Sequence, residues 1–378
     1  MLLAGTPFRS TQATSVPSSS RSVAPTGPAA QSALSSIARC LRGAPPGALS
    51  TRRDTQRALA GSWSRGRSRS DWLRGHAGVC FVDTSSFGIN VVSARSSRAR
   101  DRSLLYCVVK CSAASLYRQV RQSSRAKLVL DLFDPIWLPL HGWGDSHAIS
   151  AELSEWDAII CENDYLAGCA SPYNRRVFVV PDSPQIEVFD ELRGTVRRDP
   201  QRITLGWIGG QTNVGPLFKL VEPLEALFER FPQLHLRIVG ADPWRLPPFE
   251  KVRYSCRPTF NQEQMAREVL AFDIGLFPLF HNEQGRARGT LKAKVYMSGG
   301  AVAVCENYGE NPKLIEDDVN GCLASSQDEW YAKLARLIID ADRRTAIAER
   351  GLATIRERYT ATHMFGRLIG AFDKVLSV

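Results

Sequence analysis

The chain has 378 residues, which is enough for two ordinary domains and a tail. Apolar residues make up 44% of it, so the composition can build real cores. The formal net charge of +10 indicates an anionic partner, such as nucleic acid, a phosphorylated substrate or an acidic membrane surface. No apolar run approaches the ~20 residues that a membrane-spanning helix needs.

Residues 1–75 have the composition of a disordered tail. They contain eleven Arg, no Lys and only two acidic residues, so much of the positive excess lies there and says little about the folded part. Stretches such as STQATSVPSSSRSVAPTGPAAQS carry too few apolar side chains to offset their ordering entropy. We predict plain disorder, and leave open an organellar transit peptide, a wrongly chosen start and RNA binding.

The nine cysteines are scattered among apolar residues. An odd count of this kind indicates reduced, buried thiols in a cytosolic protein. Cys107 and Cys111 are spaced for one helix face, but no second Cys or His pair completes a zinc set. The sequence therefore predicts no metal site and a cytoplasmic location, with peripheral membrane association left open.

From about residue 76 short apolar runs alternate with helical spacing. A short helix is predicted at 115–124, and buried strands at 104–111, 126–135, 158–163 and 175–183. Strands that alternate with helices indicate a parallel sheet with right-handed crossovers. A first α/β domain is therefore predicted over 76–200.

A second series of the same kind begins at Ile203. The apolar runs ITLGWIGG, LHLRIVGAD, VRYSCRP, DIGLFPLF and AVAVCEN are predicted strands. Amphipathic spacing and Pro signals predict helices between and after them, at 215–232, 261–272, 289–300, 311–321, 329–359 and 362–376. The chain is thus predicted to be α/β, with two Rossmann-like doubly wound domains joined near 184–202 and facing a cleft.

Three loops of the second series follow the carboxyl ends of strands. Gly209-Gly210 precedes a helix, where backbone amides can approach a phosphate closely because glycine has no Cβ. The loop 281–289 and the loop 306–311 fall on the same rim of the sheet. Because ligands of such folds bind beyond the carboxyl ends of the strands, we expect these loops to converge on one site.

The loop 281–289 is cationic. Arg286, Arg288 and Lys292 lie on the rim opposite the glycine pair, and arginine binds phosphate groups bidentately. The joint placement predicts a diphosphate site rather than a solvated basic face. Lys294 is left ambiguous, with solvent exposure favoured.

The second series resembles the donor-binding domain of GT-B-type glycosyltransferases, family four (group 1) and its relatives. The resemblance is carried, in order, by LGWIGG, PQLHLRIVG, DIGLFP, Arg286–Met297 and GGAVAVCENYGENPKLIEDDVNGCLASSQDEW, and is clearest over residues 203–330. It implies a C-terminal nucleotide-sugar-binding domain at 201–355 and a helix at 356–378 that packs back on the N-terminal, acceptor-side domain. KLVLDLFDPIW, AIICENDYLAG and VFVVPDS resemble that acceptor side more faintly, and its opening strand with a glycine-rich loop is reduced to a remnant or divergent form at 77–90.

The resemblance also implies an activity. The protein would transfer a sugar from a nucleotide-diphosphate sugar, with retention and without an essential metal or another cofactor, in polysaccharide or glycoconjugate synthesis. The acceptor would be a carbohydrate, a lipid-linked molecule or a protein, and no nucleic acid is expected. Arg288 and Lys292 would neutralise the leaving diphosphate, and the expected donor-binding residues are Gly209, Gly210, Glu283, Arg286, Asn307, Glu310 and Asn311.

Two departures from the family pattern concern carboxylates. The family often carries a Glu pair eight positions apart, where this chain has Ala287 and Val295. A basic variant of the motif in a related subgroup fits Arg286–Lys292 better. A non-catalytic GT-B-like protein that binds a nucleotide or partner, and a sugar-nucleotide epimerase, stay open as alternatives. No catalytic base stands out, because His141, His147, Asp134 and Asp145 are equally well explained as structural residues.

Overall fold

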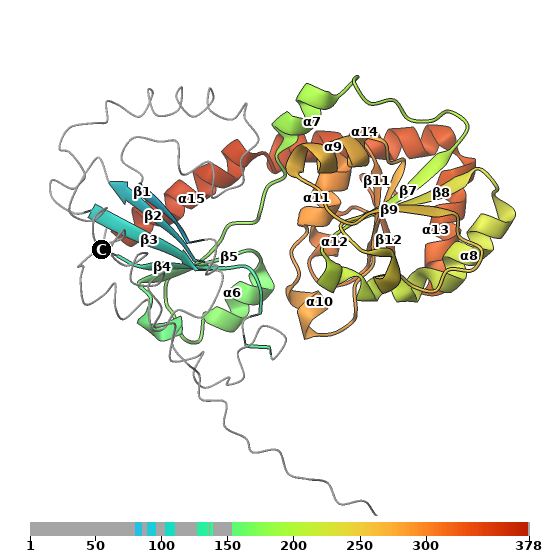
Figure 1. Ribbon diagram of the computed structural model, residues 1–378. Helices are drawn as coiled ribbons and strands as arrows, with labels where there is room; N and C mark the ends of the chain where they lie inside the picture. Colours follow the sequence, from blue (N-terminus) through green and yellow to red (C-terminus); the bar gives the residue numbers. More distant parts are fainter. Residues whose placement is uncertain are drawn as a thin grey trace, which may run out of the picture.

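The structure is a computed structural model that describes residues 80–84, 89–95, 103–109, 127–135, 137–138 and 153–376 (Figure 1). The tail predicted at 1–75 and the helix predicted at 115–124 lie outside these ranges, as do His141, Asp145 and His147. The described part forms two α/β domains, and the last helix returns from the second domain to the first.

The N-terminal domain begins with an antiparallel sheet, of order β1-β2-β3. Its strands are β1 (Cys80–Thr84), β2 (Ile89–Arg95) and β3 (Ser103–Val109). The strand predicted at 104–111 is present, but the expectation that it belongs to a parallel series is wrong. The connection from Thr84 to Ile89 is too short for the crossover that parallel neighbours need, so β1 and β2 pair antiparallel.

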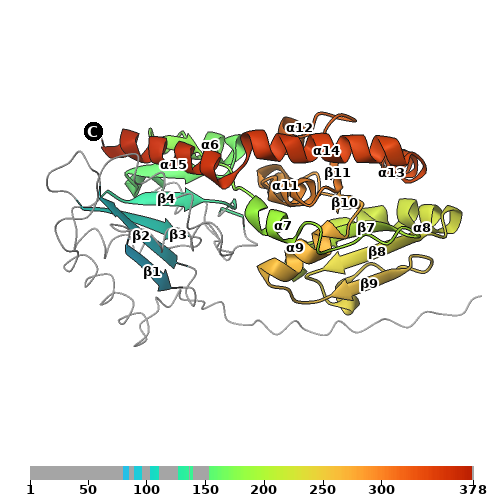
Figure 2. The same ribbon diagram turned by 90° about the horizontal axis from the view of Figure 1, so that it is seen from above.

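A second, parallel sheet follows in the order β4-β5-β6. Its strands are β4 (Val129–Leu132), β5 (Ala158–Cys161) and β6 (Val177–Val179), and every residue of β4 and β5 is buried. The side chain of Asn163 caps α6 (Asp164–Ala170) by accepting from the Leu166 amide, directly after β5. β3 contacts β4, so the two sheets lie beside each other (Figure 2).

The C-terminal domain is built on a six-stranded sheet of order β12-β11-β10-β7-β8-β9. Every neighbouring pair in it is parallel. The strands are β7 (Ile203–Ile208), β8 (Leu234–Val239), β9 (Tyr254–Arg257), β10 (Ile274–Phe277), β11 (Val302–Glu306) and β12 (Cys322–Ala324). The strand order reverses between β7 and β10, which makes their carboxyl ends the topological switch point of the sheet.

Helices cover both faces of this sheet. α8 (Val221–Arg230) and α13 (Gln327–Ile339) pack on one face, and α7 (Ile186–Leu192), α9 (Gln262–Leu270) and α11 (Leu291–Ser298) pack on the other. The helix predicted at 215–232 begins as a 3-10 helix over Gly215–Leu220. Asp340 ends α13 and caps α14 (Ala341–Arg358) by accepting from the Arg343 amide, so the stretch 329–359 forms two helices.

Two short helices stand at the carboxyl edge of the sheet, α10 (Glu283–Ala287) and α12 (Asn311–Leu314). α15 (Ala361–Leu376) leaves α14 and runs along the N-terminal domain (Figures 1 and 2). Near its end the ammonium group of Lys374 lies 5.9 Å from the centroid of the Phe178 ring. Within the described ranges no helix has the length and apolar character needed to cross a bilayer.

Candidate functional site

The site is built where the first and fourth strands of the C-terminal sheet end. Gly209 and Gly210 directly follow β7, and the segment that leads through α10 to α11 follows β10. An added Cβ on Gly209 would lie 2.7 Å from the Trp207 ring and 3.0 Å from the Lys292 ammonium nitrogen. Glycine is therefore required here by close packing, and it brings the loop backbone against Lys292.

Lys292 occupies an aromatic environment. Its ammonium nitrogen lies 4.6 Å from the centroid of the Trp207 ring and 5.2 Å from that of Phe277. Burial, together with the smaller effect of the positive charge of Arg288, lowers the pKa of Lys292 to about 7. Burial and the nearby Arg288 both disfavour the charged form of Lys292. An anionic ligand would stabilise that charged form, so this environment favours an anion.

Arg288 completes the cationic pair. Its Nη2 donates to the side-chain oxygen of Asn213 at 3.2 Å, and its Nη1 lies 3.6 Å from a carboxylate oxygen of Asp134 in the N-terminal domain. Asn213 ends the 3-10 helix that follows Gly210. The structure therefore brings Gly209, Gly210, Arg288 and Lys292 together, in an arrangement suited to an anion with two phosphate groups.

Arg286 and Glu283 face the other domain instead. The guanidinium carbon of Arg286 lies 5.2 Å from the centroid of the Tyr165 ring. Glu283 accepts hydrogen bonds from the indole of Trp137 and, at 3.4 Å, from the hydroxyl of Tyr165. Their expected donor-binding roles stay predictions, whereas their contacts in the structure tie α10 to the N-terminal domain.

The loop after β11 is held mainly by its own side chains. Asn311 is 1% exposed and donates to the Glu306 carbonyl at 2.9 Å, so it fixes the loop. Asn307 donates to the hydroxyl of Ser325 at 3.2 Å. Glu310 forms an ion pair with Lys313 at 3.1 Å. Donor contacts from these residues also stay predictions.

Lys294 is not solvated, and the preference for solvent exposure is wrong. Its side chain is fully buried, donates to the Asp182 carbonyl at 2.7 Å and lies 4.9 Å from the centroid of the Tyr359 ring. Burial lowers its pKa, while the negative charges of Glu162 and Asp182 oppose that shift. The chain passes between the domains twice, once near Asp182 and once near Tyr359. Lys294 therefore joins α11 to both of these connecting segments.

Several residues of this region were missed by sequence reasoning. Glu306 is fully buried at the end of β11 and accepts from Lys219 at 2.6 Å, with His281 Nε2 at 2.8 Å from the same carboxylate oxygen. Asn163 donates from its side chain to the Ala287 carbonyl at 2.7 Å. Only Trp207, which stands two residues before the glycine pair, carried a local signal. The other contacts join residues far apart in sequence.

Ala287 and Val295, where the family often has glutamates, are both buried. Ala287 is 0% exposed and Val295 is 6% exposed. Neither position offers a polar group to a ligand. Among the described residues, the charges at this site are the cations of Arg288 and Lys292 and the carboxylate of Asp134, which lies 3.6 Å from Arg288.

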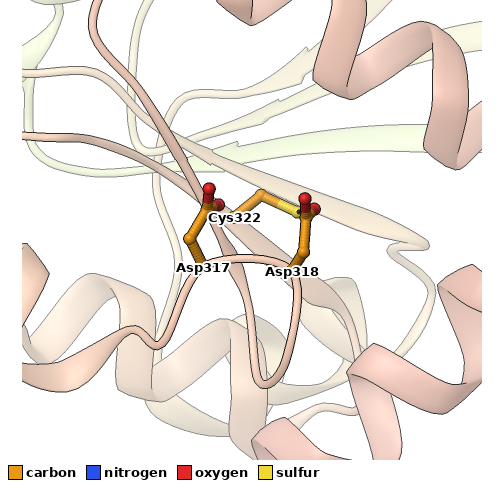
Figure 3. Close-up of side chains that lie close together, drawn as sticks. All are labelled: Asp317, Asp318 and Cys322. Atoms are coloured by element: carbon orange, nitrogen blue, oxygen red, sulfur yellow. Dashed lines mark hydrogen bonds between the residues drawn. The ribbon is translucent and has the colours of Figure 1, made fainter.

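One group in the described ranges has the spacing of a metal site, formed by Asp317, Asp318 and Cys322 (Figure 3). Lys333 lies 2.5 Å from Asp317 and 3.3 Å from Asp318, and Arg336 lies 2.5 Å from Asp318. Burial raises the pKa of Cys322 to about 12, so the thiol is a poor metal ligand. These contacts make the group an ion cluster, in which cationic side chains neutralise both carboxylates.

Comparisons with known proteins agree with this geometry. Residues 219–370 match the family described as glycosyl transferase-like. Compared with curated protein sequences, the chain has no match.

Solved structures share the fold at low sequence identity. Sucrose-phosphate synthase from Thermosynechococcus elongatus superposes with a TM-score of 0.51 at 13% identity, over 69% of this chain and 70% of that one. HepE from Anabaena, in complex with UDP and glucose, gives 0.52 at 16%, over 68% and 74%. The trehalose-6-phosphate synthase OtsA gives 0.53 at 13%, over 69% and 70%.

The finer assignment to family four is not established by these matches and stays a prediction. The family match covers the C-terminal sheet from its second strand onward, with the helices around it, and the solved structures extend the likeness to both domains. The chain therefore has the GT-B fold, and its residues 219–370 are similar to the glycosyl transferase-like family.

Proposed function

We propose that the protein transfers a sugar from a nucleotide-diphosphate sugar to an acceptor held by the N-terminal domain. The observation that supports this most directly is the convergence of Gly209, Gly210, Arg288 and Lys292 at the switch point of the C-terminal sheet. Backbone amides beside a glycine pair and two cations suit a diphosphate. The HepE structure with UDP-glucose, which shares the fold, supports the same donor class.

Charge stabilisation is the chemical role of this pair in the proposal. As the bond between the sugar and the diphosphate breaks, negative charge grows on the leaving phosphate oxygen. Arg288 and Lys292 would stabilise that charge, and stabilisation of this kind is usually the largest catalytic contribution. With two cations in place, the proposed reaction needs no metal ion or other cofactor.

Retention of the anomeric configuration, and a role in polysaccharide or glycoconjugate synthesis, are further parts of the proposal. Both rest on the resemblance to family-four enzymes. The acceptor would be a carbohydrate, a lipid-linked molecule or a protein.

Calorimetric titration with UDP and GDP tests the donor site. Lys292→Ala and Arg288→Ala should each weaken binding by roughly 1.5–3 kcal/mol, the scale of a hydrogen bond to a charged group. Lys251→Ala is the matched control, because Lys251 is exposed and pairs only with surface Glu229 at 3.1 Å. Equal affinities for wild type and both site variants would overturn the diphosphate assignment.

Incubation with several nucleotide sugars tests the reaction itself. Wild type should hydrolyse its preferred donor slowly even without an acceptor. Lys292→Ala should reduce this rate more than it reduces binding, because the charge acts mainly in the transition state. A variant that keeps the full rate would assign Lys292 to binding alone.

A further inference from the structure

α10 belongs to the C-terminal domain by sequence, but the N-terminal domain holds it along its whole length. Trp137 and Tyr165 reach Glu283 at its start, and Asn163 reaches the Ala287 carbonyl at its end. Arg288 follows directly as the C-terminal cap residue. The position of this cation therefore depends on groups from both domains.

Within the described part of the chain, the guanidinium of Arg288 has one hydrogen-bond acceptor and one ion-pair partner. The neutral one is Asn213, from the loop after Gly210. The charged one is Asp134, which follows β4 and lies 3.6 Å from Nη1. Because a carboxylate and a phosphate use the same donor geometry of arginine, Asp134 holds a place that a donor phosphate would take.

We propose that Asp134 acts as an electrostatic placeholder, which neutralises Arg288 in the donor-free protein and is displaced when the donor diphosphate binds. This inference rests on the proposed function, because it takes the diphosphate to bind Arg288. A bound diphosphate adds negative charge beside a carboxylate, and like charges at such distances repel. The Asp134–Arg288 pair would therefore break as the donor enters, and one of the contacts between the domains would be released.

The placeholder makes an unusual prediction about affinity. Removing the carboxylate removes a competitor, so Asp134→Asn should bind UDP and GDP more tightly than wild type. The pair is partly exposed, and pairs of this kind are individually weak, so the gain should be about two- to fivefold. A residue with a purely structural role would leave the affinity unchanged or weaken it.

The experiment is calorimetric titration of the full chain with UDP and GDP. Asp164→Asn is the matched control, because Asp164 also forms an ion pair between the domains, with Lys313 at 2.8 Å, and its loss removes the same charge. Asp134→Asn should tighten binding and Asp164→Asn should not. In the background of Arg288→Ala the Asp134 substitution should have a smaller effect, because only the direct repulsion between its carboxylate and the diphosphate remains to be relieved.

Asp134→Ser keeps a small polar group before Pro135 and serves as the second variant. Melting temperatures verify that both variants fold as wild type does. Unchanged or weaker nucleotide affinity in both folded variants would overturn the placeholder while leaving the proposed function intact, provided that Lys292→Ala still weakens binding. Absence of UDP and GDP binding in wild type would overturn both.

Discussion

The ammonium group of Lys292 lies over the indole ring of Trp207, 4.6 Å from its centroid, and close to Gly209, which directly follows β7. This contact places the cation where protein atoms replace water, which explains the lowered pKa of about 7. A bound diphosphate would reverse the shift, since a nearby negative charge favours the ammonium form.

Donor affinity should therefore depend on pH through Lys292. Below a pH of about 7 the free protein already holds the ammonium ion, and above it binding must take up a proton. UDP or GDP affinity should fall as the pH rises above about 7, by up to about tenfold per unit until the pKa of the bound state is reached. Titration calorimetry in buffers of different ionisation enthalpy would show the proton uptake directly.

Lys292→Arg is the control for this pH profile. Arginine keeps its charge at every accessible pH, so the fall in affinity should disappear even if the absolute affinity changes. An equally steep fall in Lys292→Arg would assign the pH dependence to another group.

Lys294→Ala should destabilise the protein. The substitution removes a fully buried side chain and leaves the Asp182 carbonyl without its hydrogen-bond donor. It also removes the positive charge that balances the nearby carboxylates of Glu162 and Asp182. Breaking such a buried pair typically costs about 3–5 kcal/mol of unfolding free energy. Lys294→Met, which refills the volume, should cost less. Denaturant unfolding monitored by circular dichroism would measure both.

The exposed Lys251 again provides the comparison. Its ion pair with Glu229 lies on the surface, so Lys251→Ala should change the unfolding free energy by less than about 1 kcal/mol. If Lys294→Ala were as stable as Lys251→Ala, the buried cluster between the domains would contribute nothing to stability.

The order of strands and loops made much of the C-terminal domain predictable. Gly209-Gly210 and the loop before α11 follow β7 and β10, and parallel strands end at one edge, so their convergence follows from topology. The direction of the strands was less predictable in the N-terminal domain. The apolar run of β3 looks the same in a parallel or an antiparallel sheet, because local sequence does not encode the pairing partner.

The sequence also did not predict which charged side chains are buried. Lys292 and Lys294 are two residues apart on α11, so they point to different sides of the helix. One side faces the sheet edge, and the other faces the segments that connect the domains. Which cation is buried depends on contacts with Asp182 and Tyr359, which are distant in sequence. The contact of Glu283 with Trp137 could not be predicted either, because these two residues are also distant in sequence.

The cluster of Asp317, Asp318 and Cys322 should not respond to metal ions. Lys333 and Arg336 already contact its carboxylates (Figure 3 shows the three potential ligands). Although burial raises the pKa of Asp318, the hydrogen bonds from Arg336 and Cys322 and the positive charge of Lys333 together outweigh it and lower the pKa overall. Zinc chloride or a chelator should leave the melting temperature unchanged. A saturable rise in melting temperature with zinc, absent in Asp318→Ala, would contradict this.

Gly289→Ala tests how closely the domains must approach at the donor site. A Cβ at this position would lie 2.3 Å from the Glu162 carboxylate oxygen and 2.7 Å from its Cγ. Glu162 is 5% exposed and accepts from the Asp182 amide at 2.8 Å, so it has little freedom to move away. The segment that carries Arg288 would shift instead. Misplacement of about 1 Å can cost on the order of 10²-fold in rate, so transfer should fall steeply while the C-terminal sheet stays folded.

Gly168→Ala is the matched substitution, because Gly168 lies in α6 and an added Cβ would meet nothing within 4 Å. It should keep full activity and slightly raise the melting temperature, since alanine loses less backbone entropy in a helix. Transfer rates and melting curves of the two variants, measured side by side, separate the cost of the added methyl group from the effect of its position. Full activity in Gly289→Ala would show that Glu162 moves freely and that the close approach of the domains at this point does not position Arg288.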